Sequence, residues 1–245
     1  MAFKLQERRR ESIIPSIALI GASGSGKTKS AIRLARGLTG NGRVTIIDTE
    51  NKRSAFYADD WKPWRFKAID LRPDFTPERY INAAEQAIED GCEALIIDQI
   101  SFEWAGTGGI LEQVGEAEEK NAFSKWRVPS KIHKEFVDYL TGIKVPNIIT
   151  MRAKEQYEMI VDEKGRMTPK KMGLGPIQRD GIEYEFPFVF LLNYAHAATV
   201  TKDNSGLFGD ITIDMLAEEH GKKIIQWARG VGNGAGKEKR KKRGR

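Results

Sequence analysis

The sequence has little cysteine and little histidine. Of its 245 residues, only Cys92 is a cysteine, so no disulfide can form within the chain, and a reducing compartment such as the cytoplasm suits it. The three histidines are His133, His196 and His220. Their wide separation and the lack of a second cysteine argue against a structural zinc site.

Long hydrophobic runs are also missing. The longest strongly apolar segment, residues 186–192, is interrupted by Pro187 and is far shorter than a membrane-spanning helix. The first 11 residues carry three consecutive arginines but no apolar segment of the kind a secretory signal needs. We therefore expect a cytoplasmic protein with no membrane partner.

The sequence has almost no net positive charge outside the C-terminus, although the whole chain has a formal net charge of +6. Residues 237–245 contain seven basic residues and one acid, which is 7 − 1 = +6, so residues 1–236 are close to neutral. A like-charged run after a glycine-rich segment cannot pack, and we expect residues 231–245 to be a disordered basic tail. Such a tail either contacts nucleic-acid phosphates or serves only to keep the protein in solution.

The most specific motif is a glycine-rich segment with the spacing G-x-x-x-x-G-K-T. It consists of Gly21, Ala22, Ser23, Gly24, Ser25, Gly26, Lys27 and Thr28. An apolar run precedes it and a helical pattern follows it, which is the context that a phosphate-binding P-loop requires. The backbone N–H groups of such a loop and the next helix N-terminus surround a polyphosphate. We expect Lys27 to neutralise the β- and γ-phosphates and the Thr28 hydroxyl to bind Mg²⁺.

Two further buried strands are predicted to end in an acidic residue. Residues 43–48 end at Asp48, with Glu50 two positions later, and residues 94–98 end at Asp98. The carboxyl ends of parallel strands lie at one edge of a sheet, where α/β proteins bind ligands. We expect Glu50 near the γ-phosphate, orienting or deprotonating water, and Asp98 holding Mg²⁺ through water. The alternative for Glu50 is a solvated acid in a loop.

A fourth strand is predicted over residues 147–151, with Arg152 directly after it. Arg152 either senses the γ-phosphate or forms a surface ion pair. Residues 156–168 then indicate a hairpin. Later elements are predicted as strands over 186–193 and 197–202 and a closing helix over 213–228, while earlier helices are predicted from Pro77 to Gly91 and from Val128 to Gly142.

Basic residues without acids follow the fourth strand. They are Lys164, Arg166, Lys170, Lys171 and Arg179. Their spread among glycines and prolines predicts a flexible basic loop that contacts nucleic-acid phosphates. A solvated loop without a ligand is the alternative.

In this order, the P-loop, Ile47-Asp48-Thr49-Glu50 and Leu95-Ile96-Ile97-Asp98 resemble the ATPase core of RecA-like recombinases. The short chain is more closely similar to the phage-encoded RecA-like single-strand annealing ATPases. The resemblance implies a RecA-like P-loop NTPase core of the α/β class, with a mainly parallel central sheet flanked by helices. It covers residues 13–230 and leaves residues 1–12 as a flexible N-terminal segment.

The resemblance also implies a site and partners. ATP and Mg²⁺ are the expected cofactors, Glu50 activates the hydrolytic water, and the nucleotide binds between adjacent subunits of a ring or filament. Lys202 matches the position at which the family presents a basic residue to a neighbour's phosphates. Single-stranded DNA is the expected partner, with a single-stranded-DNA-binding protein as a further one, in the host-cell cytoplasm if the chain is phage-encoded.

The leading hypothesis is thus a DNA-stimulated ATPase that binds single-stranded DNA and promotes strand annealing or recombination. Two alternatives stay open at this point. One is an ATP-gated adaptor, such as a helicase loader or a packaging accessory. The other is a P-loop kinase that acts on a small molecule.

Overall fold

A computed structural model describes residues 5, 13–119, 121–161 and 165–231. The segment expected to be flexible, residues 1–12, lies outside the described residues apart from Leu5, and so does the basic tail from residue 232 onward. Within the described part, no helix is long and apolar enough to cross a membrane.

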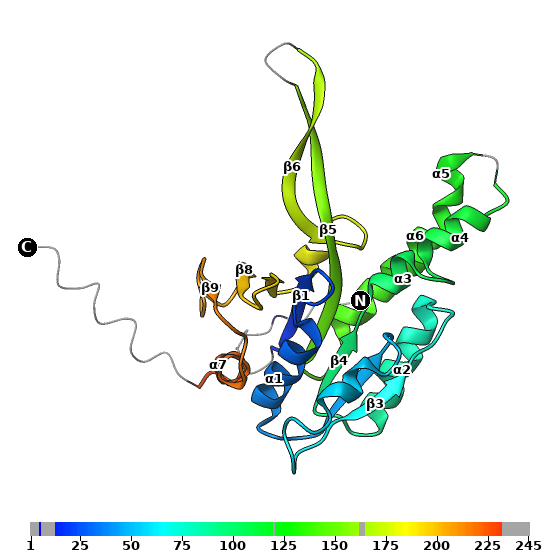
Figure 1. The fold of residues 1–245 in the computed structure, drawn as a ribbon. Coiled ribbons are helices and arrows are strands. Elements are labelled where there is room, and N and C mark those ends of the chain that lie inside the picture. Colours follow the sequence, from blue (N-terminus) through cyan, green and yellow to red (C-terminus); the bar gives the residue numbers. More distant parts are fainter. Residues whose placement is uncertain (1–4, 6–12, 120, 162–164, 232–245) are drawn as a thin grey trace, which may run out of the picture.

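The described strands form one nine-stranded sheet in the order β3-β2-β4-β5-β1-β7-β8-β9, with β6 paired to β5 alone (Figure 1). The strands are β1 (Ser16–Gly21), β2 (Val44–Asp48), β3 (Lys67–Asp70), β4 (Ala94–Asp98), β5 (Asn147–Val161), β6 (Met167–Pro176), β7 (Phe188–Leu192), β8 (Ala198–Asp203) and β9 (Thr212–Ile213). The six neighbouring strands β3, β2, β4, β5, β1 and β7 are all paired parallel. The pairs β7–β8, β8–β9 and β5–β6 are antiparallel. The predicted α/β fold with a mainly parallel sheet is confirmed.

Helices cover both faces of the sheet. They are α1 (Lys27–Thr39), α2 (Pro77–Glu89), α3 (Ser101–Ala105), α4 (Ile110–Glu116), α5 (Ala122–Lys125), α6 (Arg127–Gly142) and α7 (Glu218–Ala228), with 3₁₀ turns η2 (Arg53–Tyr57) and η3 (Ile182–Glu185). Alternate strand residues pack on opposite faces. Ile17 and Leu19 join the core beneath α1 and α7, whereas Ala18 and Ile20 join the core beneath α2 and α6. Because both faces are covered, the central strands are continuous apolar runs.

The sequence alone misplaced the end of one strand and the start of one helix. β5 does not end at Met151 but continues to Val161, and β6 pairs with it antiparallel to form a two-stranded ribbon that projects from the sheet (Figure 1). The expected flexible basic loop is therefore mostly a strand. The closing helix begins at Glu218 rather than Ile213, because Thr212 and Ile213 pair with β8.

The contact between α1 and α7 depends on two glycines. A Cβ atom built on Gly221 would lie 2.2 Å from the carbonyl oxygen of Leu34, and one on Gly37 would lie 2.0 Å from that of Glu218. Both obstacles are backbone atoms, which cannot move aside as a flexible side chain can. The two helix backbones are thus in direct contact across the core.

Replacing Gly221 with Ala should therefore lower the free energy of unfolding by about 2 kcal/mol, since the added methyl group forces the helices apart. The matched control is Gly115→Ala in α4, where no atom lies within 4 Å of the added Cβ and helix propensity favours alanine by up to about 1 kcal/mol. Thermal and denaturant unfolding measure both variants. Equal midpoints for the two would contradict the described packing of α1 on α7.

Candidate functional site

The glycine-rich loop connects β1, in the middle of the sheet, to α1. Gly24 and Gly26 adopt left-handed conformations, with φ of 83° and 86°, that a side chain would disfavour. The Lys27 ammonium lies across the loop and donates to the carbonyl oxygens of Gly21 and Ala22, each at 2.9 Å. Burial lowers the pKa of Lys27, and the nearby carboxylates of Asp98 and Glu50 oppose this effect without cancelling it.

A cavity of about 500 Å³ opens above this loop and along α1. Its lining includes the loop, both ends of the 3₁₀ turn that follows β2, and two residues from beyond β7. The lining residues are Ser23, Gly24, Gly26, Lys27, Thr28, Lys29, Ser30, Arg33, Glu50, Arg53, Phe56, Tyr57, His196 and Met215. The cavity combines cationic side chains and helix N–H groups with an aromatic side, a composition suited to a nucleotide.

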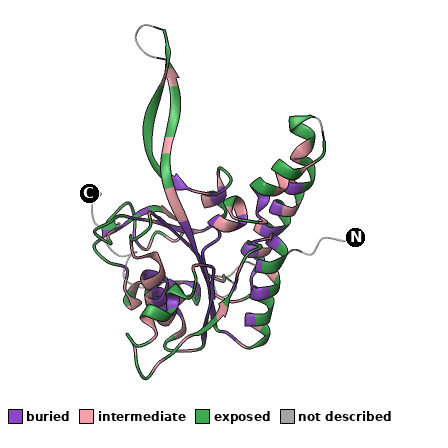
Figure 2. Cartoon of the chain, turned by 45° about the vertical axis from the view of Figure 1, so that its right-hand side comes forward, coloured by how far each residue is buried: buried purple, intermediate pink, exposed green. Residues whose placement is uncertain are grey.

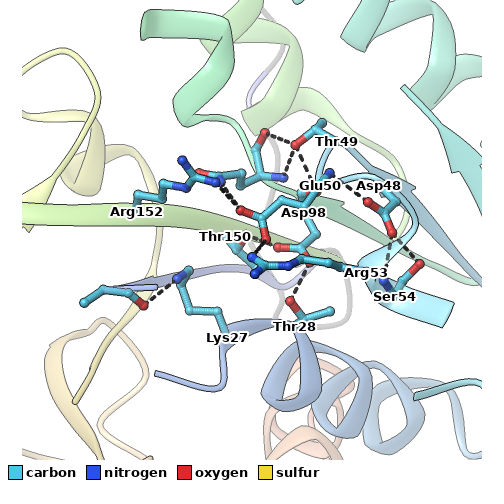
Figure 3. A network of polar contacts seen from close by, with 12 residues as sticks. Lys27, Thr28, Asp48, Thr49, Glu50, Arg53, Ser54, Asp98, Thr150 and Arg152 are labelled. Atoms are coloured by element: carbon cyan, nitrogen blue, oxygen red, sulfur yellow. Dashed lines mark hydrogen bonds and ion pairs between the residues drawn. The ribbon is translucent and has the colours of Figure 1, made fainter. Parts of the chain in front are cut away.

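Asp98 joins the loop to the sheet. It ends β4, is buried, and accepts hydrogen bonds from the Thr28 hydroxyl (2.6 Å, to Oδ2) and from the Thr150 hydroxyl on β5 (2.5 Å, to Oδ1). Burial raises the pKa of Asp98, and the two hydroxyl hydrogen bonds offset part of this rise. The structure thus brings Asp98 and Thr28, which are both expected to hold Mg²⁺, together at one edge of the sheet (Figure 3).

Glu50 lies at the same edge, where three donors hold its carboxylate. Oε1 accepts from Arg152 (2.5 Å) and from the Gln99 side chain (2.6 Å), and Oε2 accepts from Arg53 (3.0 Å; Figure 3). Burial by itself raises the pKa of Glu50, but the hydrogen bonds and charges of the two arginines outweigh it, so the pKa is lowered. Glu50 is an anion at neutral pH, and Arg152 forms an ion pair with it.

Asp48 ends β2 and pairs with Asp98 across the β2–β4 register, but its carboxylate has a different role. One carboxylate oxygen accepts from the Glu50 backbone N–H at 2.8 Å, and the other accepts from the backbone N–H and the hydroxyl of Ser54. These hydrogen bonds hold the start of η2, which carries Arg53 and Tyr57 into the cavity wall. Asp48 thus shapes the loop that presents Glu50.

The structure does not bring Lys202 to this cavity. Lys202 lies on β8, two strands away from β1, and its ammonium donates to the carbonyl oxygen of Tyr184 at 2.5 Å. Lys202 therefore does not line the cavity of its own chain. Its assignment to a neighbour's nucleotide stays a prediction.

The five basic residues expected to bind DNA are not one cluster. Lys170 and Lys171 lie on β6, where Lys171 forms an ion pair with Glu155 across the ribbon. Arg166 precedes that strand and Arg179 follows it, beside α6. Lys164 lies outside the described residues. The ribbon therefore carries part of the predicted basic surface, and Arg179 stands apart from it.

A comparison with protein families places this site in context, because residues 15–222 match the family described as AAA domain. The chain belongs to this family. Among curated proteins, none matches the chain. An AAA domain is a P-loop ATPase in general, and the assignment of residues 21–28 as its ATP-binding loop stays a prediction.

The residues present also fit Mg²⁺, which such ATPases typically use. The Thr28 hydroxyl and the Asp98 carboxylate supply adjacent oxygen ligands, the type that Mg²⁺ prefers. They lie beside Lys27, whose ammonium would neutralise the β- and γ-phosphates of the same nucleotide. When bound, the metal would neutralise charge that develops on the phosphate oxygens.

Several side chains of the site were missed by sequence reasoning. Gln99 is buried, and its backbone N–H is fixed by the Thr49 hydroxyl at 3.0 Å while its side chain holds Glu50. Thr150 lies within the predicted strand 147–151, but the sequence pattern indicates no role for it. The signal for both is the register of β4 beside β5, in which Ile97 pairs with Ile149, and this register cannot be read from the separate segments. Nothing in the sequence pointed to His196.

The raised pKa of Asp98 predicts a trade-off between stability and function. When the pKa of an acid is higher in the folded than in the unfolded protein, the free energy of unfolding falls as the pH rises from the unfolded-state pKa, about 4, through the folded-state pKa. At neutral pH, Asp98→Asn should therefore raise the unfolding free energy of the nucleotide-free protein by on the order of 1 kcal/mol. It should also remove the stabilisation that Mg²⁺ adds to ATP binding.

Thermal unfolding with no ligand, with ATP and EDTA, and with ATP and Mg²⁺ measures both effects. Asp48→Asn is the matched control. Asp48 accepts backbone hydrogen bonds, so removing its charge should lower the free energy of unfolding of the protein. A lower unfolding temperature for Asp98→Asn than for the wild type at pH 7, without ligand, would contradict the expected stabilisation.

Proposed function

We propose that the chain is an ATP-dependent single-stranded-DNA-binding protein that promotes strand annealing or homologous recombination. One observation supports this most directly: β5 is a single strand that reaches from the ATP site into the projecting ribbon. Its first half carries Thr150 and Arg152, which contact Asp98 and Glu50. Its second half forms one side of the ribbon (Figure 2). Such a strand suits a protein in which nucleotide and DNA bind at two ends of one element.

The surface of the ribbon supports DNA as the ligand. One face has four apolar side chains that are 54–65% exposed: Tyr157, Met159, Val161 and Met167. They share a face because Val161 pairs directly with Met167 and alternate residues of a strand point the same way. Residues 153–161 and 165–176 contain four Lys or Arg residues and two Glu residues, so the ribbon has an excess of positive charge. An aromatic ring that stacks on a base, here Tyr157, beside cations that bind phosphates is typical of single-strand binding.

The proposed chemistry is hydrolysis of ATP. Lys27 and the P-loop N–H groups would hold the phosphates, and Thr28 with Asp98 would hold Mg²⁺. The anionic carboxylate of Glu50 would accept a hydrogen bond from the attacking water and so point its lone pair at the γ-phosphorus. Gln99 would keep that carboxylate in place. Arg152 and Arg53 already face the site, and a γ-phosphate would compete with Glu50 for their guanidinium groups.

Assembly into a ring or filament belongs to the same proposal. Lys202 supports it, because this lysine lies outside the cavity of its own chain and is partly exposed on β8. In an oligomer of a RecA-like type it would approach a neighbour's phosphates. The arrangement would make hydrolysis depend on contact between subunits.

One observation favours a second candidate function, the ATP-gated adaptor. Two arginine side chains and one amide side chain donate hydrogen bonds to the carboxylate of Glu50. If these contacts persisted with ATP bound, Glu50 would not reach a water, and the protein would bind ATP with little turnover. It would then act through a protein partner rather than through DNA.

The steady-state rate of ATP hydrolysis, with Mg²⁺ at low salt, tests the proposal. We expect single-stranded DNA to stimulate it, and Glu50→Gln to lower kcat by about 10²-fold or more while ATP still binds. Lys27→Ala should lose ATP binding instead, which separates binding from chemistry. No stimulation by DNA, together with tight ATP binding, would reject the recombinase proposal and favour the adaptor.

DNA contact by the ribbon has its own test. Replacing Lys170 and Lys171 together with Gln should weaken single-strand binding and reduce the slope of log K against log salt by about 1.4, at about 0.7 for each lost phosphate contact. Lys222 and Lys223, exposed on α7 and far from the ribbon, give the matched control pair (Figure 1). Fluorescence anisotropy of a labelled oligonucleotide measures the slopes. Equal slopes for both pairs would place the DNA site elsewhere.

A further inference from the structure

The turn between β7 and β8 lies beside the P-loop. Leu192, the last residue of β7, is paired with Gly21, the first residue of the loop, so the chain leaves β7 next to the phosphate-binding backbone. Three hydrogen bonds fix the turn. Asn193 and Ala197 are joined by a backbone bond (3.0 Å) and by the Asn193 side chain (3.1 Å), and His196 N–H donates to the Asn193 carbonyl (3.0 Å).

His196 adopts a left-handed conformation in this turn, with φ of 65°. This conformation costs a residue other than glycine on the order of 1 kcal/mol. Such residues persist where the surroundings fix them, and they concentrate at ligand sites. In this turn the imidazole lies against the P-loop, beside Gly26.

The imidazole and Gly26 fit closely together. A Cβ atom built on Gly26 would lie 2.9 Å from Nδ1 of His196, so a larger residue at this point of the loop would force the ring to move. His196 is an exposed residue and belongs to neither apolar core. Burial of the ring within the core therefore does not account for its position.

His196 also lines the 500 Å³ cavity, from the wall opposite Glu50. The sheet order puts β2, which leads to Glu50, on one side of β1 and β7 on the other. The lining between these walls carries the cations Lys27, Lys29 and Arg33. A ligand that lies along the loop would thus contact Glu50 and Arg53 on one side and the imidazole of His196 on the other.

We propose that His196 binds the phosphates of the nucleotide by donating an imidazole N–H, from the side of the loop opposite Glu50. P-loop N–H groups hold the α- and β-phosphates, and His196 packs against one glycine of that loop, so these phosphates are the groups within its reach. The inference rests on the proposed binding of ATP in this cavity. It adds a phosphate-binding residue outside the P-loop motif.

Two substitutions test the proposal without disturbing the turn. His196→Gly removes the imidazole and suits the left-handed backbone, so the variant should unfold at or above the wild-type temperature. His196→Asn keeps an N–H donor, and Asn tolerates this conformation better than most residues. Tyr194→Ala is the matched control, because Tyr194 is exposed on the same turn and does not line the cavity.

The measurement is displacement of a fluorescent ADP analogue by ADP and by inorganic tripolyphosphate. We expect His196→Gly to weaken both competitors about tenfold or more, as loss of a hydrogen bond to a charged group implies. His196→Asn should restore part of the loss, and Tyr194→Ala should change neither affinity.

Equal affinities for wild type and His196→Gly would overturn the inference while leaving ATP binding intact. Weaker ADP with unchanged tripolyphosphate would also overturn it, since the imidazole would then contact the nucleoside. A wild-type protein that binds neither competitor would overturn the proposed function itself, and the inference with it.

Discussion

The buried carboxylate of Asp98 is the contact on which the site depends. A carboxylate without water is costly unless hydrogen bonds replace its hydration. Two hydroxyls do so at this position, one from the first turn of α1 and one from β5. The same two bonds fix the distance between the P-loop helix and the sheet. The Thr28 hydroxyl, which a P-loop offers to Mg²⁺, is thereby held beside the carboxylate that would share the metal.

Asp48 and Asp98 end neighbouring strands in the same register, yet their surroundings give them different tasks. Asp48 has backbone N–H groups within reach, and it uses both oxygens to organise the chain from Glu50 to Ser54. Asp98 meets only hydroxyl donors among the hydrogen bonds described for its side chain, and these can turn toward a metal. Donor type, rather than position on the strand, separates the structural acid from the candidate metal ligand.

How far the sequence predicted the structure depends on how local each signal is. The P-loop, the strands ending in Asp48 and Asp98, and Glu50 are encoded in short segments, and sheet topology then brings them to one edge. Gln99, Thr150 and His196 become visible only through strand register and through a turn from another part of the chain. The hairpin predicted over residues 156–168 is confirmed by the antiparallel pairing of β5 with β6. The rest of β6, beyond residue 168, is not predicted because its glycines, proline and lysines lack the alternation of a half-buried strand, and only pairing with β5 makes it one.

The ribbon is anchored through the residue that holds Glu50. Two-stranded antiparallel ribbons are marginally stable alone, so the root of this one matters. There, Arg152 N–H donates to the Ser101 hydroxyl at 2.9 Å, and Arg152 C=O accepts from Ile177 N–H at 2.6 Å, just beyond β6. Its guanidinium meanwhile contacts Glu50 and lies over the Phe102 ring. A shift of the Arg152 backbone cannot occur without loosening the root of the ribbon, and a shift of its side chain cannot occur without changing the charge beside Glu50.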